Sequence, residues 1–139
     1  MRVVLDTNCL LVALPQISPY HCLWDAFQCG KFTLCYSAEI LQEYEELLWR
    51  RHHSSLTITV IMELLLNSSN VYQVIPYYKW NLISADPDDN KFVDCALNAG
   101  ADFIVTNDKH FNILKEIDFP PIKVIDIEGF KKILESFPF

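Results

Sequence analysis

Two aspartates follow short apolar segments that are typical of buried strands. Asp6 ends the segment of residues 2–6, and Asp108 is the third residue after the segment of residues 103–105. In open α/β sheets, ligands bind at the carboxyl ends of the strands, near the point where the strand order reverses. If these two strands are neighbours, both carboxylates project from one edge of the sheet and converge. The alternative is that each Asp only begins a turn or caps the next helix.

A third carboxylate, Asp89, begins a segment with helical spacing. At about 100° per residue, Asp89 lies on the same helical face as Phe92 and Ala96. Asp94 lies on nearly the opposite face, and we expect it to be solvated. An inward carboxylate is costly to bury without a compensating positive charge, and no Lys or Arg is obviously placed to supply one, whereas a bound cation would. Alternatively, Asp89 is the N-cap and accepts backbone N–H bonds.

The helical segment of residues 38–51 carries four glutamates. Its apolar residues form one stripe, and the periodicity places Glu39 and Glu46 on the polar face. Glu43 and Glu45 flank the stripe about equally, so periodicity does not choose between them. A glutamate at the rim of an apolar stripe is usually solvated.

Strand-like and helical segments alternate along the chain and must position these acids. Besides the two strands above, apolar runs predict strands over residues 32–36, 71–75 and 124–127. Helical spacing predicts helices over residues 20–29, 38–51, 56–66, 89–99 and 128–136. We expect Ser37 to be an N-cap and Gly100 to be a C′ residue. This alternation predicts an α/β fold with a mostly parallel sheet of about five strands between helices.

The composition is that of one folded domain, which we expect to span residues 1–139. Apolar residues make up 51% of the chain and only 3 residues are Gly, which excludes a disordered or low-complexity chain. The longest uninterrupted apolar stretch, residues 9–14, is far shorter than the roughly 20 residues of a membrane-spanning helix. The apolar run before Asp6 is also too short for a signal peptide. We therefore expect a cytoplasmic protein that does not associate with a membrane.

Several other catalytic patterns are missing from the sequence. The five cysteines form no Cys-x-x-Cys pair, which argues against a zinc site and fits free thiols in a reducing compartment. Gly30, Gly100 and Gly129 form no phosphate-binding loop, and there is no Gly-x-Ser-x-Gly elbow. An aspartyl-phosphate phosphatase is disfavoured because Asn8 stands where that chemistry needs a second Asp.

Four segments, taken together and in this order, resemble the motifs of PIN-domain nucleases. They are Asp6-Thr7-Asn8, residues 39–48 around Glu43, residues 86–92 and residues 101–109. Each motif alone is weak, but four in the right order and at the right spacing are specific, and they span nearly the whole chain. The resemblance implies a three-layer α/β/α fold and an acidic cluster that binds Mg²⁺ or Mn²⁺ for cleavage of RNA.

The resemblance also assigns roles to single residues. The acidic metal ligands correspond to Asp6, Glu43, Asp89 and Asp108, and the supporting polar positions correspond to Asn8 and Thr106. Residues 86–92 are most similar to the PIN subgroup of bacterial toxin–antitoxin toxins, relatives of the VapC type, which implies a small antitoxin as partner. The loop around Asp108 departs from that subgroup. Asn107 replaces a Gly, and residues 109–111 stand where a further acid is expected.

Such an acidic cluster suits phosphodiester hydrolysis. The reaction must place a water in line with phosphorus and stabilise charge on the attacking and leaving oxygens, which two hard cations about 3.5–4 Å apart can do. Mg²⁺ is typically held by only one or two carboxylates, so four acids suffice for two ions. We expect Asp6 to anchor the principal ion and Asp89 and Asp108 to complete its site. Glu43 would hold or orient the second ion or the water.

The net charge of −7 at first argues against a nucleic-acid partner, because phosphate binding usually shows as a basic balance. Without the four acids the net charge is −3, and two divalent ions would neutralise the cluster. RNA affinity would then depend on the ions and on local cations. The nearest candidates are Arg50, Arg51, His52 and His53 at a helix end, and Lys91, Lys109 and His110 near the proposed site. A basic helix end more often only complements the helix dipole.

The sequence therefore predicts a metal-dependent endoribonuclease that is the toxin of a toxin–antitoxin pair. A second interpretation is a catalytically silent PIN-like module that binds RNA or a protein. A third interpretation is an oligomerisation unit that forms a homo-oligomer through an interface of aromatic side chains. We expect most of the aromatic residues concerned to cover the core or the sheet instead. They are Tyr72, Tyr77, Tyr78, Trp80, Phe137 and Phe139.

Overall fold

A five-stranded parallel sheet forms the centre of the computed structural model, which describes residues 1–51, 53–77, 79–83, 87–117 and 121–136. The strands are β1 (Arg2–Leu5), β2 (Thr33–Tyr36), β3 (Val71–Gln73), β4 (Phe103–Val105) and β5 (Val124–Ile125). Their order is β3-β2-β1-β4-β5, and each neighbouring pair is parallel. All five strands coincide with predicted segments, and the α/β fold class is confirmed.

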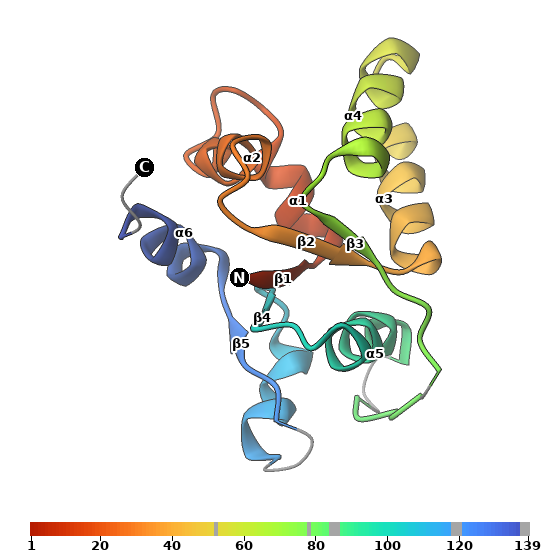
Figure 1. The fold of residues 1–139 in the computed structure, drawn as a ribbon, viewed down its shortest axis with the longest axis vertical. Coiled ribbons are helices and arrows are strands. Elements are labelled where there is room, and N and C mark those ends of the chain that lie inside the picture. The colour runs from red at the N-terminus through yellow and green to blue at the C-terminus, as the bar shows by residue number, and fades with distance from the viewer. Residues whose placement is uncertain (52, 78, 84–86, 118–120, 137–139) are drawn as a thin grey trace.

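Helices cover both faces of this sheet (Figure 1). They are α1 (Thr7–Ala13), α2 (His21–Gln28), α3 (Ala38–Arg50), α4 (Ser55–Asn67), α5 (Asn90–Ala99) and α6 (Ile127–Glu135), with 3₁₀ helices η1 (Pro87–Asp89) and η2 (Lys109–Glu116). In Figure 1, α5 lies on one side of the sheet, and α1, α2, α3 and α4 lie on the other. Within the described part of the chain, none of these helices is long and apolar enough to cross a bilayer.

The helix ends follow the predicted capping chemistry. The Ser37 hydroxyl accepts a hydrogen bond from the backbone N–H of Ile40 at the start of α3. Gly100 ends α5 in the left-handed conformation with φ of 62°, which a residue without a Cβ adopts at little cost. Three short elements, α1, η1 and η2, were not predicted. In α1, side chains on nearly every side are buried, so the segment lacks the one-sided pattern that identifies a surface helix.

The strand order reverses at the pair of β1 and β4. Leu5 is paired with Val105 in the register of these strands, and the backbone N–H of Asp6 donates to the Val105 carbonyl at 3.0 Å. The condition set by the sequence is therefore met, since the strands that precede Asp6 and Asp108 are neighbours. Ligands of open α/β sheets bind at this kind of position.

A buried tyrosine ties α3 to the end of β1. The Tyr44 hydroxyl donates to the carbonyl of Leu5 at 2.6 Å, and the Tyr44 side chain is fully buried. A buried hydroxyl and carbonyl that satisfy each other avoid the cost of an unpaired polar group. This bond sets the position of α3, and with it Glu43, relative to the carboxyl edge of the sheet.

The prediction that Asp94 is solvated is wrong. Asp94 is only 6% exposed, and its carboxylate accepts a hydrogen bond from the backbone N–H of Trp80 at 2.9 Å. One turn earlier, the Asn90 amide both donates to the Ile83 carbonyl and accepts from its N–H, at 2.8 and 2.9 Å. The face of α5 that periodicity assigned to water is covered by the backbone of residues 79–83.

The expectation that the aromatic residues cover the core or the sheet is also wrong for three of them. Tyr72, Tyr77 and Trp80 are all exposed large side chains. The Trp80 backbone N–H donates to Asp94 of α5, so the backbone of this segment faces the helix. The Trp80 side chain is left partly exposed for this reason. Tyr78 and residues 137–139 lie outside the described residues.

Replacing Asn90 by Ala should destabilise the fold by about 2 kcal/mol, because the Ile83 N–H and carbonyl would lose their partner in a buried environment. Urea denaturation followed by circular dichroism measures this difference. Asn112→Ala, which changes an exposed asparagine of η2, is the matched control and should stay within about 0.5 kcal/mol of the parent. Equal stability of the two variants would contradict the proposed role of Asn90.

Candidate active site

Asp6 lies buried at the carboxyl end of the central strand, with 9% of its surface exposed. The Thr106 hydroxyl donates to Asp6 Oδ2 at 2.7 Å and accepts from the backbone N–H of Asp108 at 3.0 Å. Thr106 therefore joins the two acids that follow β1 and β4. The sequence resemblance predicts a supporting role for Thr106, and the structure places its side chain between Asp6 and the backbone of Asp108.

Burial is the main influence on the ionisation of Asp6. Loss of solvation raises the pKa of this carboxyl above its ordinary value, and the negative charges of Glu43 and Asp108 raise it further. Hydrogen bonds from the Thr106 hydroxyl and the Thr7 backbone act in the opposite direction but do not cancel the effect. The ionised form of Asp6 is therefore disfavoured unless a positive charge lies beside it.

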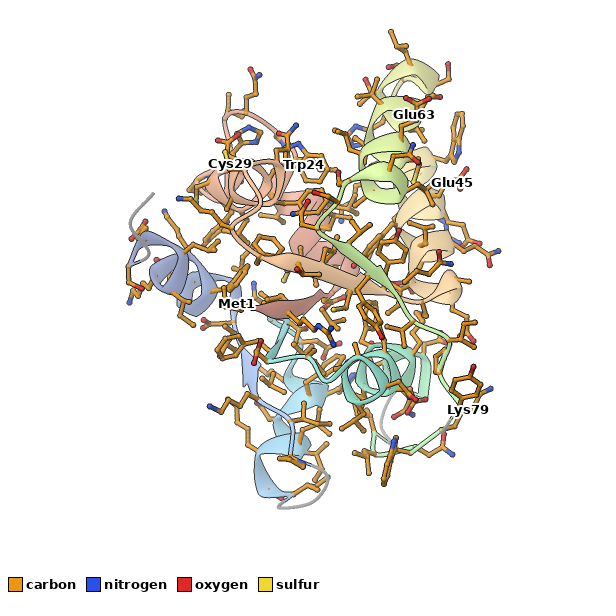
Figure 2. All side chains as sticks on the ribbon, in the orientation of Figure 1. Met1, Trp24, Cys29, Glu45, Glu63 and Lys79 are labelled. Carbon is orange, nitrogen blue, oxygen red and sulfur yellow. The ribbon has the colours of Figure 1, made fainter. Side chains whose placement is uncertain are left out.

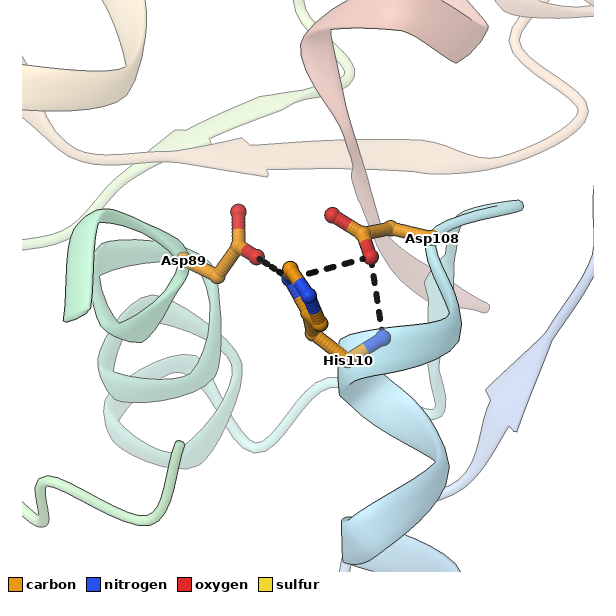
Figure 3. A group of neighbouring side chains, drawn as sticks. All are labelled: Asp89, Asp108 and His110. Carbon is orange, nitrogen blue, oxygen red and sulfur yellow. Dashed lines mark hydrogen bonds and ion pairs between the residues drawn. The ribbon is translucent and has the colours of Figure 1, made fainter. Parts of the chain in front are cut away.

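Asp89 and Asp108 face each other across the ring of His110 (Figure 3). His110 Nδ1 lies 3.3 Å from Asp108 Oδ1 and 3.5 Å from Asp89 Oδ2. The backbone N–H of His110 also donates to Asp108 Oδ1 at 2.9 Å, which caps η2. One potential ligand atom from each of the three residues lies within 4.8 Å of the others.

The alternative that Asp89 caps α5 does not hold. Asp89 stands at the N-cap position, but its φ and ψ of −73° and −17° are helical, and within the described chain its side chain makes no capping hydrogen bond. The Asp89 side chain is 13% exposed and directs Oδ2 toward His110. Asp86, in the same motif, lies outside the described residues.

Glu43, and not Glu45, faces the site. The Thr7 hydroxyl donates to Glu43 Oε2, and Lys91 Nζ lies 2.7 Å from Glu43 Oε1. Glu45 is exposed and lies on the outer side of α3 (Figure 2). Lys91 comes from the start of α5, so this ion pair joins α3 to the helix that carries the Asp89 segment. Sequence reasoning had placed Lys91 near the site without finding its partner.

Asn8 brings the basic end of α3 to the rim of the site. Its Oδ1 accepts a hydrogen bond from an Arg51 guanidinium nitrogen at 3.4 Å. A pocket of about 290 Å³ lies beside Asn8 and is lined by Asp6, Asn8, Cys9, Val12, Asn107, Asp108 and Ile127. His52, in the same basic group, lies outside the described residues.

The residues present fit a hard divalent cation. Asp89 and Asp108, which come from η1 and the start of η2, bring carboxylate oxygens within 4.8 Å of each other, and carboxylates are the ligands that Mg²⁺ and Mn²⁺ prefer. Asp6 stands outside that group in the described residues, but its carboxyl lies near enough to Asp108 for the two charges to interact. Asp6 is buried, and the neighbouring charges disfavour its ionised form. A bound cation would reverse both penalties by placing positive charge among the carboxylates.

A family model described as a PIN domain matches residues 2–110. The chain belongs to the PIN domain family. PIN domains are generally nucleases, so membership supports a hydrolase. No curated protein matches the chain.

Solved PIN-like structures agree with this assignment. One similar structure is a chain of VapBC2 from Rickettsia felis, which was solved bound to a DNA fragment from the VapBC2 promoter. It superposes with a TM-score of 0.59 at 18% sequence identity, and the match covers 91% of this chain and 98% of that chain. The RRP44 PIN domain of T. brucei superposes with a TM-score of 0.55 at 13% identity, covering 96% and 80%. At these identities the likeness shows a shared fold.

Replacing Asp6 by Asn should stabilise this PIN domain at pH 7 in EDTA, by about 1 kcal/mol. The pKa of Asp6 is higher in the folded protein than in the unfolded chain. The parent therefore loses stability as the pH rises from the ordinary Asp range through the folded-state pKa of Asp6. The asparagine side chain does not titrate, so the Asp6→Asn variant has no such loss. The difference should shrink toward pH 4. Urea denaturation between pH 4 and 8 measures it, with Glu45→Gln as control. If Asp6→Asn is less stable than the parent at every pH, the raised pKa of Asp6 in the folded protein is contradicted.

Proposed function

We propose that this PIN domain, expected to span residues 1–139, is a metal-dependent endoribonuclease. Its catalytic and metal-binding residues are Asp6, Glu43, Asp89 and Asp108, supported by Asn8 and Thr106. The observation that carries the proposal is the meeting of Asp6 and Asp108 at the reversal of strand order, joined through Thr106. Asp89 is directed to the same edge from the start of α5.

Bound Mg²⁺ or Mn²⁺ would supply charge stabilisation at the attacking and leaving oxygens of a phosphodiester. The protein's own part is to hold and orient the ligands. Thr106 fixes the Asp6 carboxylate by its bond to Oδ2, and the η2 backbone fixes Asp108 through Oδ1. Glu43 is held by Thr7 and Lys91, and from there it would help hold or orient the second ion or the attacking water.

RNA would approach this acidic protein through local cations. Arg51 contacts Asn8 at the rim of the site. Arg50 and Lys91 line a second pocket of about 450 Å³, which they share with the acids Glu39, Glu43, Glu46 and Asp88. A phosphate backbone would be drawn to these side chains, while the ions offset the charge of the carboxylates. In this proposal the basic end of α3 would contact RNA as well as complement the helix dipole.

The cellular role that we propose is that of the toxin of a toxin–antitoxin pair. The fold is shared with a chain of the VapBC2 complex from Rickettsia felis, solved with a DNA fragment from their promoter. By analogy, a small antitoxin would bind this protein and restrain it, and the pair would act in the cytoplasm.

Cleavage of a mixed single-stranded RNA pool tests the activity. Purified protein should cut in Mg²⁺ or Mn²⁺ and not in EDTA, and Asp6→Asn or Asp108→Asn should reduce the rate by more than about 100-fold because each removes a ligand. Glu45→Gln, two residues from Glu43, removes the same charge from α3 outside the site and should cut at the parent rate. Near-parental, metal-dependent cutting by Asp6→Asn would refute the site. A folded protein that binds Mn²⁺ but cuts no RNA would favour the binding-module interpretation.

Replacing Arg51 by Ala should raise KM for RNA about three- to tenfold and leave kcat nearly unchanged, because in this proposal Arg51 would contact a phosphate of the RNA backbone and would not touch the reacting atoms. The slope of log KM against log salt should fall by about one. Lys132→Ala removes one exposed positive charge from α6 and is the control. A fall in kcat without a change in KM or in salt dependence would exclude this role.

A further inference from the structure

We propose that His110 is a nitrogen ligand of the metal ion held by Asp89 and Asp108. The ion at this position would then have a mixed nitrogen and oxygen donor set, which favours Mn²⁺ or a later transition ion over Mg²⁺. This inference rests on the proposed function and specifies the chemistry of one of its metal positions.

The distances are those of neighbouring donors around one small cation. Donors about 2.1 Å from an ion and at right angles to each other lie about 3.0 Å apart. His110 Nδ1 is 3.3 Å from one carboxylate oxygen and 3.5 Å from the other. Only small adjustments would bring all three atoms to bonding distance from a shared ion.

The backbone makes this arrangement rigid. Asp108 is the N-cap of η2. The backbone N–H of His110 donates to Asp108 Oδ1, and this hydrogen bond holds the histidine backbone beside the Asp108 carboxylate. The ring is thereby directed back across the start of the helix toward Asp89, which lies on η1 at the other side of the site. His110 is the one imidazole in the described metal-capable group, and its place depends on this cap.

A simple ion pair accounts for this geometry less well than a metal ligand. Nδ1 carries at most one proton and faces two oxygen atoms from different segments at nearly equal distances. One N–H cannot point well at both oxygens. A cation can be bound by the Nδ1 lone pair and both carboxylates at once.

The donor type has a consequence for metal choice. Mg²⁺ takes oxygen ligands and keeps several of its waters, so an imidazole adds little to its binding. Imidazole nitrogen suits transition ions, whose affinity rises from Mn²⁺ toward later metals of the series. His110 would therefore strengthen Mn²⁺ binding much more than Mg²⁺ binding.

Pulsed electron paramagnetic resonance on the Mn²⁺-loaded protein tests the bond directly. The parent should show ¹⁴N modulation from a directly bound nitrogen, and His110→Ala and His110→Gln should lose it. His53→Ala, which removes a histidine beyond the end of α3, should keep it. Absence of ¹⁴N modulation in the parent, or its persistence in both His110 variants, would overturn the proposal.

Calorimetric titration supplies a second measurement that does not depend on catalysis. His110→Ala should weaken Mn²⁺ binding at least tenfold and Mg²⁺ binding less than threefold. Equal weakening of Mn²⁺ and Mg²⁺ binding would show that His110 adds no selective nitrogen bond, and tighter binding of both ions would identify it as a competitor of the metal. Either result would overturn the proposal. Asp108→Asn separates the two hypotheses. If Asp108→Asn abolishes Mn²⁺ binding while His110→Ala leaves Mn²⁺ affinity unchanged, only the histidine assignment fails. If it leaves Mn²⁺ binding intact, the proposed acidic site fails as well.

Discussion

A buried carboxylate at the end of the central strand is the constraint on which this structure depends. Asp6 follows β1, and both its burial and its acidic neighbours oppose its ionisation. The chain tolerates this cost because donors from two directions, the Thr106 hydroxyl and the Thr7 backbone, partly offset it. A fold organised for stability alone would place an apolar residue or an amide here, so the retained acid points to function.

The other three acids share two basic side-chain partners. Lys91 of α5 pairs with Glu43 of α3, and His110 of η2 lies between Asp89 and Asp108. The Lys91–Glu43 and His110–Asp89 contacts cross between elements, so they fix the relative positions of the helices around the carboxyl edge of the sheet. The positive charge of Lys91 thereby limits the repulsion between Glu43 and the other carboxylates.

Most of the architecture follows from local patterns, because each strand is a short apolar run and most helices have one apolar face. The site could be predicted as far as strand ends define it, since Asp6 and Asp108 need only neighbouring strands to converge. The position of Asp94 could not be predicted, because periodicity does not reveal that a backbone segment covers the outer face of α5. The choice of Glu43 over Glu45 depends on Lys91 and Thr7, which are distant in sequence.

The pairing of the first strand with the fourth also bears on how the chain matures. Thr106 and Asp6 are separated by 100 positions, and β1 has no β4 beside it until that length has been synthesised. At roughly 5–20 residues per second on the ribosome, several seconds pass before the two strands can meet. During that interval the nascent chain lacks both Asp108 and the hydroxyl that orients Asp6. The long-range register thus keeps the acidic centre unassembled until the chain has been synthesised through β4 and Asp108.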